Sequence, residues 1–599
     1  MFKKAILAGV LATTLLAGHF EKPSQAQSPG SVVRKITSVT PLSDMVGRYE
    51  KFEVVVELDG EINNPYDPND VRLDGQFISP SGQTMLVAGF WYQDFAEELS
   101  ATGDTLTPTE DWSWRVRFTP NEAGEWTYQI LATTAVRGTV TSEKQHFMVA
   151  ESDEHGFVRF DTRNPRYLAF DDGTPYFPIG ANVSWYGAGG MADYQKWFDT
   201  MAENGGNFAR VWMASWAFSI EWLDTGLGNY DRRQNRAYQL DTLFNMADER
   251  GIYIMLTLLN HGQFNTGVDP EWDANPYNAA NGGPLSAPVE FATNPEAERL
   301  WHQKIRYIAA RWGYSTHIMS WEWWNEVNWT PLASASILGP WTERSEAFLA
   351  TVDPYQHLTT VSGPIVADDV VWDYVDIIHA HHYNMQSLVQ DFNQAIPRWL
   401  NAYPDKPYIA GEFGSPNEYD VHGLLLHLGL WSAPMNGSLG TGMSWYWEDL
   451  YDDGLYYQLK GIAAYFAGED LAAHQWQLLE AAMDDESKAA ARVYGIQDAQ
   501  HAHVWVVSKK YSEAQLVKLY EKNLRNRVED PLDIQFPDIT DAKVVISGLN
   551  DGDYTAEIWD TLAGEAIATE TITVADGQGE IPLPTFNTDV AIKVNPVAE

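Results

Sequence analysis

Residues 318–329, which read IMSWEWWNEVNW, decide the fold prediction. The run is rich in aromatic and branched residues and contains no Gly or Pro, which is typical of a buried strand. Glu326 lies at its end, where a carboxylate is costly unless it is paired or functional. A surface glutamate just past a strand end is the alternative interpretation of this stretch alone.

A second stretch, residues 407–414, reads PYIAGEFG and repeats the pattern. Glu412 ends this short strand-like run, and Gly414 and Pro416 follow it as loop residues. Two carboxylates, each at the end of its own strand, are what cleavage of a glycosidic bond requires.

Asn325 and Glu326 after a Trp-rich strand, with Glu412 at a later strand end, resemble the clan A retaining glycoside hydrolases. Members of that clan are (β/α)8 barrels that carry an acid/base Glu after the fourth strand and a nucleophilic Glu after the seventh. The resemblance covers roughly residues 152–480, and it implies that Glu326 is the acid/base and Glu412 the nucleophile.

Strand and helix patterns alternate through this part of the chain. Strands are expected at 176–182, 207–213, 252–259, in the opening stretch, and at 359–362, 377–381, 407–412 and 442–447. Helices are expected at 191–204, 238–250, 295–312, 343–352, 385–403 and 457–467. The α/β alternation predicts a (β/α)8 TIM barrel. An open doubly wound sheet is the competing fold, although no Gly-rich phosphate turn follows the first strand.

Polar and aromatic residues lie at the ends of the expected strands in the order that the family shows. The resemblance implies that these residues contact the substrate or its surroundings: Arg210, His261, Asn325, His381, Tyr383, Trp445 and Trp447. Trp445 fits the strand-eight position best, and Trp447 is the alternative on the same face of a strand.

The chemistry suggests a task for several of these residues. Arg210 would favour the charged form of Glu412, and Tyr383 could donate a hydrogen bond to it. Asn325 matches the family residue that binds the sugar 2-hydroxyl. Arg210 has a structural alternative, as a cation paired with Glu322, which we expect to be a buried structural carboxylate.

Glu326 must begin the reaction protonated, so its surroundings must raise its pKa. Trp323 and Trp324 are expected to supply part of an apolar shell for it. Further tryptophans lie in or beside the predicted loops, where each could stack on a sugar or belong to the core: Trp185, Trp216, Trp272, Trp329 and Trp447.

Short strand patterns separated by turns flank the barrel on both sides. Residues 33–150 predict an antiparallel, Ig-like β-sandwich, and residues 484–599 predict a second β-sandwich, with the barrel at 152–483. The first segment resembles an N-terminal domain often fused to clan A barrels, and the second resembles the small C-terminal domain of many secreted glycosidases. The roles of both flanking domains stay open.

The N-terminal segment indicates the cellular compartment, and the composition argues against some kinds of partner and site. Residues 1–26 carry Lys3 and Lys4, an apolar run and a small-residue cleavage site, which predicts a signal peptide and a secreted, extracellular or periplasmic protein. There is no Cys, which excludes thiolate metal sites and Cys nucleophiles. The net charge of −43 argues against nucleic acid as a partner. We expect no membrane span after signal cleavage, no metal and no cofactor.

The predicted function is a secreted retaining glycoside hydrolase that cleaves a β-linked poly- or oligosaccharide. A non-catalytic carbohydrate-binding or adhesion protein is one alternative. A metal-dependent amidohydrolase-like barrel is another, because His379 and His381 have a His-x-His spacing on a strand. The sugar, the linkage, internal or terminal cleavage and the oligomeric state stay open.

Overall fold

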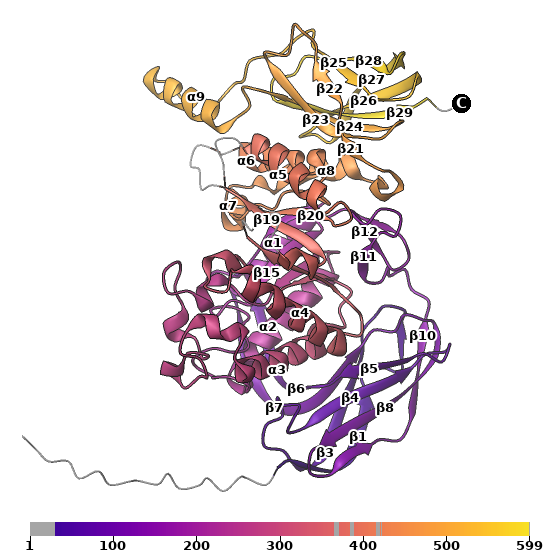
Figure 1. Ribbon diagram of the computed structural model, residues 1–599, viewed down its shortest axis with the longest axis vertical. Coiled ribbons are helices and arrows are strands. Elements are labelled where there is room, and N and C mark those ends of the chain that lie inside the picture. Colours follow the sequence, from indigo (N-terminus) through magenta and orange to yellow (C-terminus); the bar gives the residue numbers. More distant parts are fainter. Residues whose placement is uncertain (1–29, 364–369, 384–387, 415–419, 421, 598–599) are drawn as a thin grey trace, which may run out of the picture.

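The computed structural model describes residues 30–363, 370–383, 388–414, 420 and 422–597. The predicted signal peptide at 1–26 lies outside these residues. Antiparallel sheets from the two ends of the chain lie at opposite ends of the molecule, and a helix-covered barrel lies between them (Figure 1). The predicted α/β architecture, a barrel flanked by β-sandwiches, is therefore confirmed, while the domain limits near residues 151 and 484 stay predictions.

The N-terminal sandwich consists of two facing sheets. One has the strand order β1-β3-β7-β6 and the other β2-β10-β8-β4-β5, with β9 paired to β8. Apolar side chains from the inner faces meet between them, as in the stacked rings of Phe52 and Phe147, whose centroids lie 3.7 Å apart. The strands are β1 (Val32–Pro41), β2 (Met45–Gly47), β3 (Phe52–Glu61), β4 (Arg72–Ile78), β5 (Thr84–Ala88), β6 (Phe90–Ser100), β7 (Gly103–Phe118), β8 (Gly124–Thr134), β9 (Gly138–Thr141) and β10 (Gln145–Ala150).

Seven consecutive parallel strands form the barrel sheet, in the order of the chain. They are β14 (Gly180–Asn182), β15 (Phe208–Trp212), β16 (Tyr253–Thr257), β17 (Ile318–Glu322), β18 (Leu358–Ser362), β19 (Ile377–His382) and β20 (Tyr408–Phe413). Ser444 forms parallel bridges to both Ala181 in β14 and Phe413 in β20. An extended segment around Ser444 therefore stands in the place of the eighth strand and closes the barrel between the two edge strands.

This eighth segment is shorter than the strand expected at 442–447. Backbone hydrogen bonds join Met443 to Ala410 and Trp445 to Phe413, but helix α7 (Trp447–Asp452) then begins at Trp447. The strand pattern of the sequence thus extends into the first residue of a helix, because aromatic residues suit either structure when they are buried.

Helices surround the barrel, and their apolar faces pack against its strands. Asn294 accepts hydrogen bonds from the backbone N–H groups of Glu296 and Ala297, so it caps α3, which has Pro295 at its first position. The helices are α1 (Met191–Glu203), α2 (Gln234–Asp248), α3 (Pro295–Trp312), α4 (Ala335–Val352), α5 (Leu388–Ala402), α6 (Leu424–Ser432), α7 and α8 (Leu459–Phe466). The sequence did not predict α6, because it is apolar on all sides and shows no helical periodicity.

A small sheet closes the amino-terminal end of the barrel. Strands β11 (Val158–Phe160), β12 (Leu168–Phe170) and β13 (Pro175–Tyr176) place Leu168 and Phe170 against Met255 and Met319, which come from two barrel strands. The opposite, carboxyl-terminal end is left for the residues that follow the strands.

The C-terminal sandwich pairs the sheet β21-β23-β24-β29-β26-β27 with the smaller sheet β22-β25-β28. Its strands are β21 (Gln477–Leu478), β22 (Ala481–Met483), β23 (Ala491–Gln497), β24 (Ala502–Ser508), β25 (Lys543–Ser547), β26 (Gly552–Asp560), β27 (Glu565–Val574), β28 (Gln578–Pro582) and β29 (Asp589–Pro596). An additional helix that the sequence did not predict, α9 (Glu513–Arg525), lies between β24 and β25. Among the described residues, no helix is both long enough and apolar enough to span a bilayer.

Candidate active site

Glu326 and Glu412 lie at the carboxyl-terminal end of the barrel. Glu412 is in the last part of β20, and Glu326 follows β17 with backbone angles of φ 49° and ψ 48°. This left-handed conformation is uncommon for a residue with a side chain and is typical of functional sites. Carboxylate oxygens of the two residues lie within 4.8 Å of one another.

His381, which β19 carries, lies between the two carboxyl groups. Its Nδ1 is 2.9 Å from Oε1 of Glu326 and 3.2 Å from Oε2 of Glu412. Burial lowers the pKa of His381 to about 4, although the Glu412 carboxylate opposes the shift. The ring is therefore neutral at neutral pH and can donate from Nδ1 to only one carboxylate at a time.

Arg210 in β15 is fully buried and joins two carboxylates. Its Nη1 donates to Oε1 of Glu412 at 2.6 Å, and its Nε and Nη2 donate to Glu322 at 2.6 and 2.8 Å. Both interpretations of Arg210 from the sequence therefore hold: it pairs with the structural Glu322, and it also contacts Glu412. Thr257 donates a further hydrogen bond to Glu322, which fixes this carboxylate.

Asn325 and Tyr383 complete the hydrogen bonds around the carboxyl groups. The Asn325 side-chain oxygen accepts from Nη2 of Arg210 at 2.7 Å, and its amide nitrogen lies 3.1 Å from Nδ1 of His261. The Tyr383 hydroxyl donates to Oε2 of Glu412 at 2.6 Å. The structure thus brings Arg210, His261, Asn325, His381 and Tyr383 to the two glutamates.

Burial raises the pKa of both glutamates above the ordinary value. For Glu412 the nearby His381 and Arg210 oppose this rise, and for Glu326 His261 and Arg210 oppose it. The carboxyl groups are close enough to titrate as a coupled pair rather than independently. A raised pKa at two adjoining buried carboxyls is typical of acid–base sites.

The tryptophans near this end of the barrel fall into two groups. Trp216 is 44% exposed and contacts Trp185, which in turn contacts the half-buried Trp445, with ring centroids 5.1 and 5.6 Å apart. Trp329 is also exposed, whereas Trp272 is buried. The exposed and half-buried rings Trp216, Trp185 and Trp445 form a continuous aromatic row, which we call the tryptophan row.

Trp447 does not share the exposed face of Trp445. It is 4% exposed and packs against Trp185 and Trp197, because the chain turns from the extended segment into α7 at this residue. The prediction of Trp447 as a substrate contact assumed a single strand through Trp445 and Trp447. This assumption is wrong, because α7 begins at Trp447. Trp447 packs against Trp185 and so supports the tryptophan row on its buried side.

Trp323 and Trp324 come directly before Asn325 and Glu326 in the chain. Both are fully buried and pack against Trp341 in α4. They belong to the core between the barrel and its helices. Their contribution to the apolar surroundings of Glu326 stays a prediction.

Two polar residues at this site were not predicted from the sequence. Asn182 in β14 accepts from Nη1 of Arg210 at 3.0 Å, and Ser362 in β18 accepts from the backbone N–H of Glu326 at 3.3 Å. Each is a polar residue at the end of a short buried strand. This is the same signal that pointed to Glu412, so it could have found both.

The site also offers ligands of the kind that a cation requires. Glu326, His381 and Glu412 each present one ligand atom, and the three atoms lie within 4.8 Å of one another. Arg210 already neutralises one of these carboxylates at 2.6 Å. Arg210 also pairs with Glu322, so this one cation is shared between two carboxylates.

Comparison with known proteins relates the chain to carbohydrate-active enzymes. A family model described as a domain of unknown function (DUF5060) matches residues 45–133, within the N-terminal sandwich. A mannan endo-1,4-β-mannosidase F of Aspergillus clavatus is 24% identical over 300 residues, which are 47% of this chain and 65% of that protein. Its Aspergillus fumigatus counterpart is 24% identical over 201 residues, 32% of this chain and 43% of that protein. The chain thus spans less than two thirds of either relative.

The fold recurs in a solved structure of a presumed glycoside hydrolase from Bacteroides vulgatus. The two structures agree with a TM-score of 0.60 at 16% identity, covering 93% of this chain and 100% of the other. The sequence relatives confirm that this chain has homologues among the glycoside hydrolases, and the solved structure confirms the fold. Its place in clan A and a retaining mechanism stay predictions.

Proposed function

We propose that this protein is a retaining glycoside hydrolase that cleaves β-linked poly- or oligosaccharides by double displacement. The observation that carries the proposal is that one carboxylate oxygen of Glu326 lies within 4.8 Å of one of Glu412, with Nδ1 of His381 in contact with both residues. Retaining enzymes keep the two groups about 5–5.5 Å apart, whereas inverting enzymes need roughly 6.5–9.5 Å to admit a water molecule.

Glu412 is the nucleophile in this proposal. It accepts hydrogen bonds from the permanently charged Arg210 and from Tyr383, each at 2.6 Å. Glu326 has the neutral His381 as its near partner at 2.9 Å. A proton shared by the coupled pair is therefore held on Glu326, and Glu412 is the ionised member.

The first step forms a bond between a Glu412 oxygen and the anomeric carbon, while the bond from that carbon to the leaving oxygen breaks. Glu326 gives its proton to the leaving oxygen and becomes a carboxylate. In the second step Glu326 takes a proton from water, the water oxygen attacks the anomeric carbon, and the Glu412 ester bond breaks. Two inversions give net retention.

The surrounding residues position the sugar. Asn325 is held by Arg210 and lies beside His261, so its amide is fixed where the sugar 2-hydroxyl would lie. Trp445 offers a half-buried ring at the same end of the barrel. We assign His261 and Asn325 to substrate hydroxyls and Trp445 to stacking on a sugar face.

The relatives and the tryptophan row support a polysaccharide as the substrate. The matched Aspergillus proteins are named as mannan endo-1,4-β-mannosidases, which makes β-1,4-mannan the first substrate to test. Trp216, Trp185 and Trp445 contact one another edge to face, and the exposed Trp216 offers aromatic surface on which a further sugar could stack.

The test is hydrolysis of a panel of β-mannan, glucomannan, β-glucan and xylan, with sizing of the products and NMR of the first anomer released. We expect retention of configuration on at least one polysaccharide, and no product from Glu412→Ala. Folded protein that binds but does not cleave any member would favour the carbohydrate-binding alternative. Activity that requires added metal and survives loss of Glu412 would favour the amidohydrolase-like alternative.

Export from the cytoplasm is a separate proposal, which rests on the sequence of residues 1–26. Sequencing the N-terminus of the mature protein from culture medium or periplasm tests it. A mature chain that begins near residue 27 is the expected result, and an intact Met1 in the cytoplasm would contradict export.

A further inference from the structure

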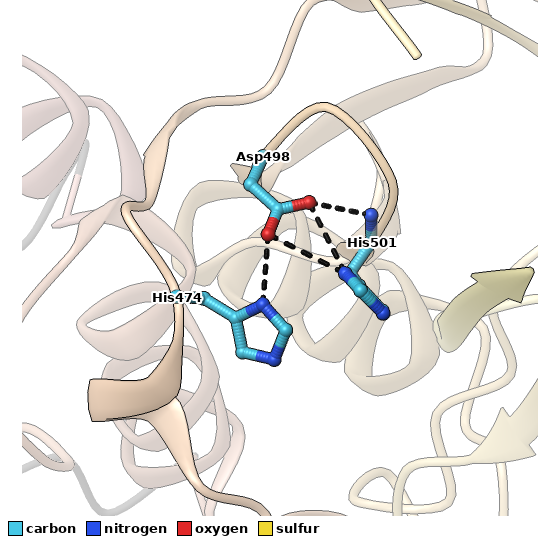
Figure 2. A group of neighbouring side chains, drawn as sticks. All are labelled: His474, Asp498 and His501. Carbon is cyan, nitrogen blue, oxygen red and sulfur yellow. Dashed lines mark hydrogen bonds and ion pairs between the residues drawn. The ribbon is translucent and has the colours of Figure 1, made fainter. Parts of the chain in front are cut away.

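Two histidines and an aspartate meet where the end of the barrel contacts the C-terminal sandwich (Figure 2). His474 follows the short helix Leu471–Ala473, just after the last barrel helix. Asp498 and His501 lie in the turn between β23 and β24 of the sandwich. The group therefore joins two parts of the fold, and the proposed reaction does not use it.

Both imidazoles turn the same ring atom toward one carboxylate. Nδ1 of His474 lies 2.7 Å from Oδ2 of Asp498, and Nδ1 of His501 lies 3.2 and 3.4 Å from its two oxygens. One ligand atom from each residue lies within 4.8 Å of the others. Ligands about 2.0–2.1 Å from a tetrahedral zinc ion are about 3.3 Å from each other. The two distances from Nδ1 to Oδ2 of Asp498, 2.7 and 3.4 Å, are close to that spacing.

We propose that His474, Asp498 and His501 form a binding site for a divalent transition metal, zinc by preference. Two neutral imidazoles and one carboxylate are donors that suit zinc better than magnesium or calcium, which prefer oxygen ligands alone. A water molecule would take the fourth position, because the three side chains are 21–28% exposed and solvent can reach them.

The Asp498 carboxylate is held in place by the backbone. The N–H groups of Gln500 and His501 both donate to Oδ1 at 2.7 Å, which leaves Oδ2 directed toward His474. Hydrogen bonds of this kind orient the ligands of metal sites.

The segment that carries His474 is also fixed to the connector before the barrel. Asn164 donates to the carbonyl of His474 at 2.8 Å, and Arg163 pairs with Asp470 at 2.6 Å. An ion between His474 and the β23–β24 turn would therefore tie the sandwich to a rigid part of the barrel. We infer that the ion stabilises this junction, so that its loss weakens the contact and leaves the chemistry at Glu326 and Glu412 intact.

The test uses the full-length chain after dialysis against a chelator, titrated with zinc chloride by calorimetry and followed by thermal unfolding. We expect one zinc site and a rise of at least about 2 °C in the unfolding midpoint when zinc exceeds Kd 100-fold. His501→Ala should weaken binding by at least about 10-fold and abolish the rise. Asp498→Asn, which keeps the shape of the side chain, should do the same.

His155→Ala is the matched control, because His155 and Asp172 form a 2.7 Å pair of the same kind without a second histidine. It should leave zinc binding unchanged. Glu326→Gln tests the second group of possible ligands that the described residues form, Glu326, His381 and Glu412, and should also leave zinc binding unchanged. Absence of zinc binding, binding that survives both His501→Ala and Asp498→Asn, or binding lost in Glu326→Gln would each overturn the proposal. The absorption spectrum of the cobalt-substituted protein then reports the coordination geometry. A spectrum typical of six oxygen ligands would also contradict the proposal.

Discussion

The carboxyl groups of Glu326 and Glu412 come within 4.8 Å of one another, although one follows β17 and the other lies in β20, three strands further around the barrel. Closure of the barrel is what brings them together. Two carboxyl groups at this distance disfavour each other's ionised form, so the protonation of one depends on the charge of the other.

Glu412→Ala should be nearly inactive on every substrate, because it removes the group that forms the covalent bond. Added azide should restore cleavage with inverted configuration, since a small anion can occupy the space of the lost carboxylate. Anomeric NMR of the product is the measurement. A glycosyl azide of retained configuration would contradict the assignment of Glu412.

Glu326→Ala should distinguish substrates by their leaving groups. General acid catalysis is worth roughly 10²–10⁴-fold, so a polysaccharide should lose about that factor while the first step on an activated aryl glycoside survives better. Azide should then rescue the second step with retention. Equal losses on both substrates in stopped-flow and steady-state assays would argue against Glu326 as the acid.

The pH profile of kcat/KM should be bell-shaped. Activity should fall at low pH as Glu412 gains a proton and at high pH as Glu326 loses its proton, and burial moves both limbs above the ordinary pKa of a glutamate. Glu326→Gln, assayed on an activated substrate, should lose the alkaline limb and keep the acid limb. An alkaline limb that persists in this variant would assign that titration to another group.

Trp216→Ala should weaken substrate binding, whereas Trp447→Ala should lower the stability of the protein. Trp216 is 44% exposed, so its loss should raise KM for polysaccharide several-fold and leave the unfolding midpoint almost unchanged. Trp447 is 4% exposed, so its loss should cost about 3–5 kcal/mol of stability through the cavity that it leaves. Kinetics and thermal unfolding of the two variants give the comparison, and the reverse pattern would remove Trp216 from the proposed binding row.

Arg117→Met should destabilise the contact between the N-terminal sandwich and the barrel. The buried Arg117 guanidinium donates to Glu53 in β3 at 3.0 Å and to Asp241 in α2 at 2.8 Å. Removing one partner from such a buried network costs about 3–5 kcal/mol, because the remaining carboxylates stay buried without their cation. Chemical denaturation followed by tryptophan fluorescence measures the loss.

Arg34→Met is the control for this change. Arg34 pairs with Asp59 and Glu61 in the same sandwich, but these side chains are largely exposed. Exposed pairs contribute at most about 1 kcal/mol, so this variant should unfold near the wild-type midpoint. Equal losses in the two arginine variants would show that burial at Arg117 is not the cause.

Local sequence patterns were sufficient to predict the barrel and much of its candidate site. Strands in a barrel are parallel and place their carboxyl ends at one face, so residues that end successive strands must meet there. Together with the family resemblance, this reasoning predicts that Arg210, Asn325, His381 and Glu412 lie close together. It applies equally to Asn182 and Ser362, which end β14 and β18.

Only the tertiary structure decided which aromatic rings face solvent and which distant groups meet. Trp445 and Trp447 are two residues apart, and a change from strand to helix between them buries the second ring. His474 meets Asp498 and His501 only because the sandwich packs against the end of the barrel. Periodicity determines the face that a residue occupies within its own element, whereas contacts between elements depend on how those elements pack, which no local pattern encodes.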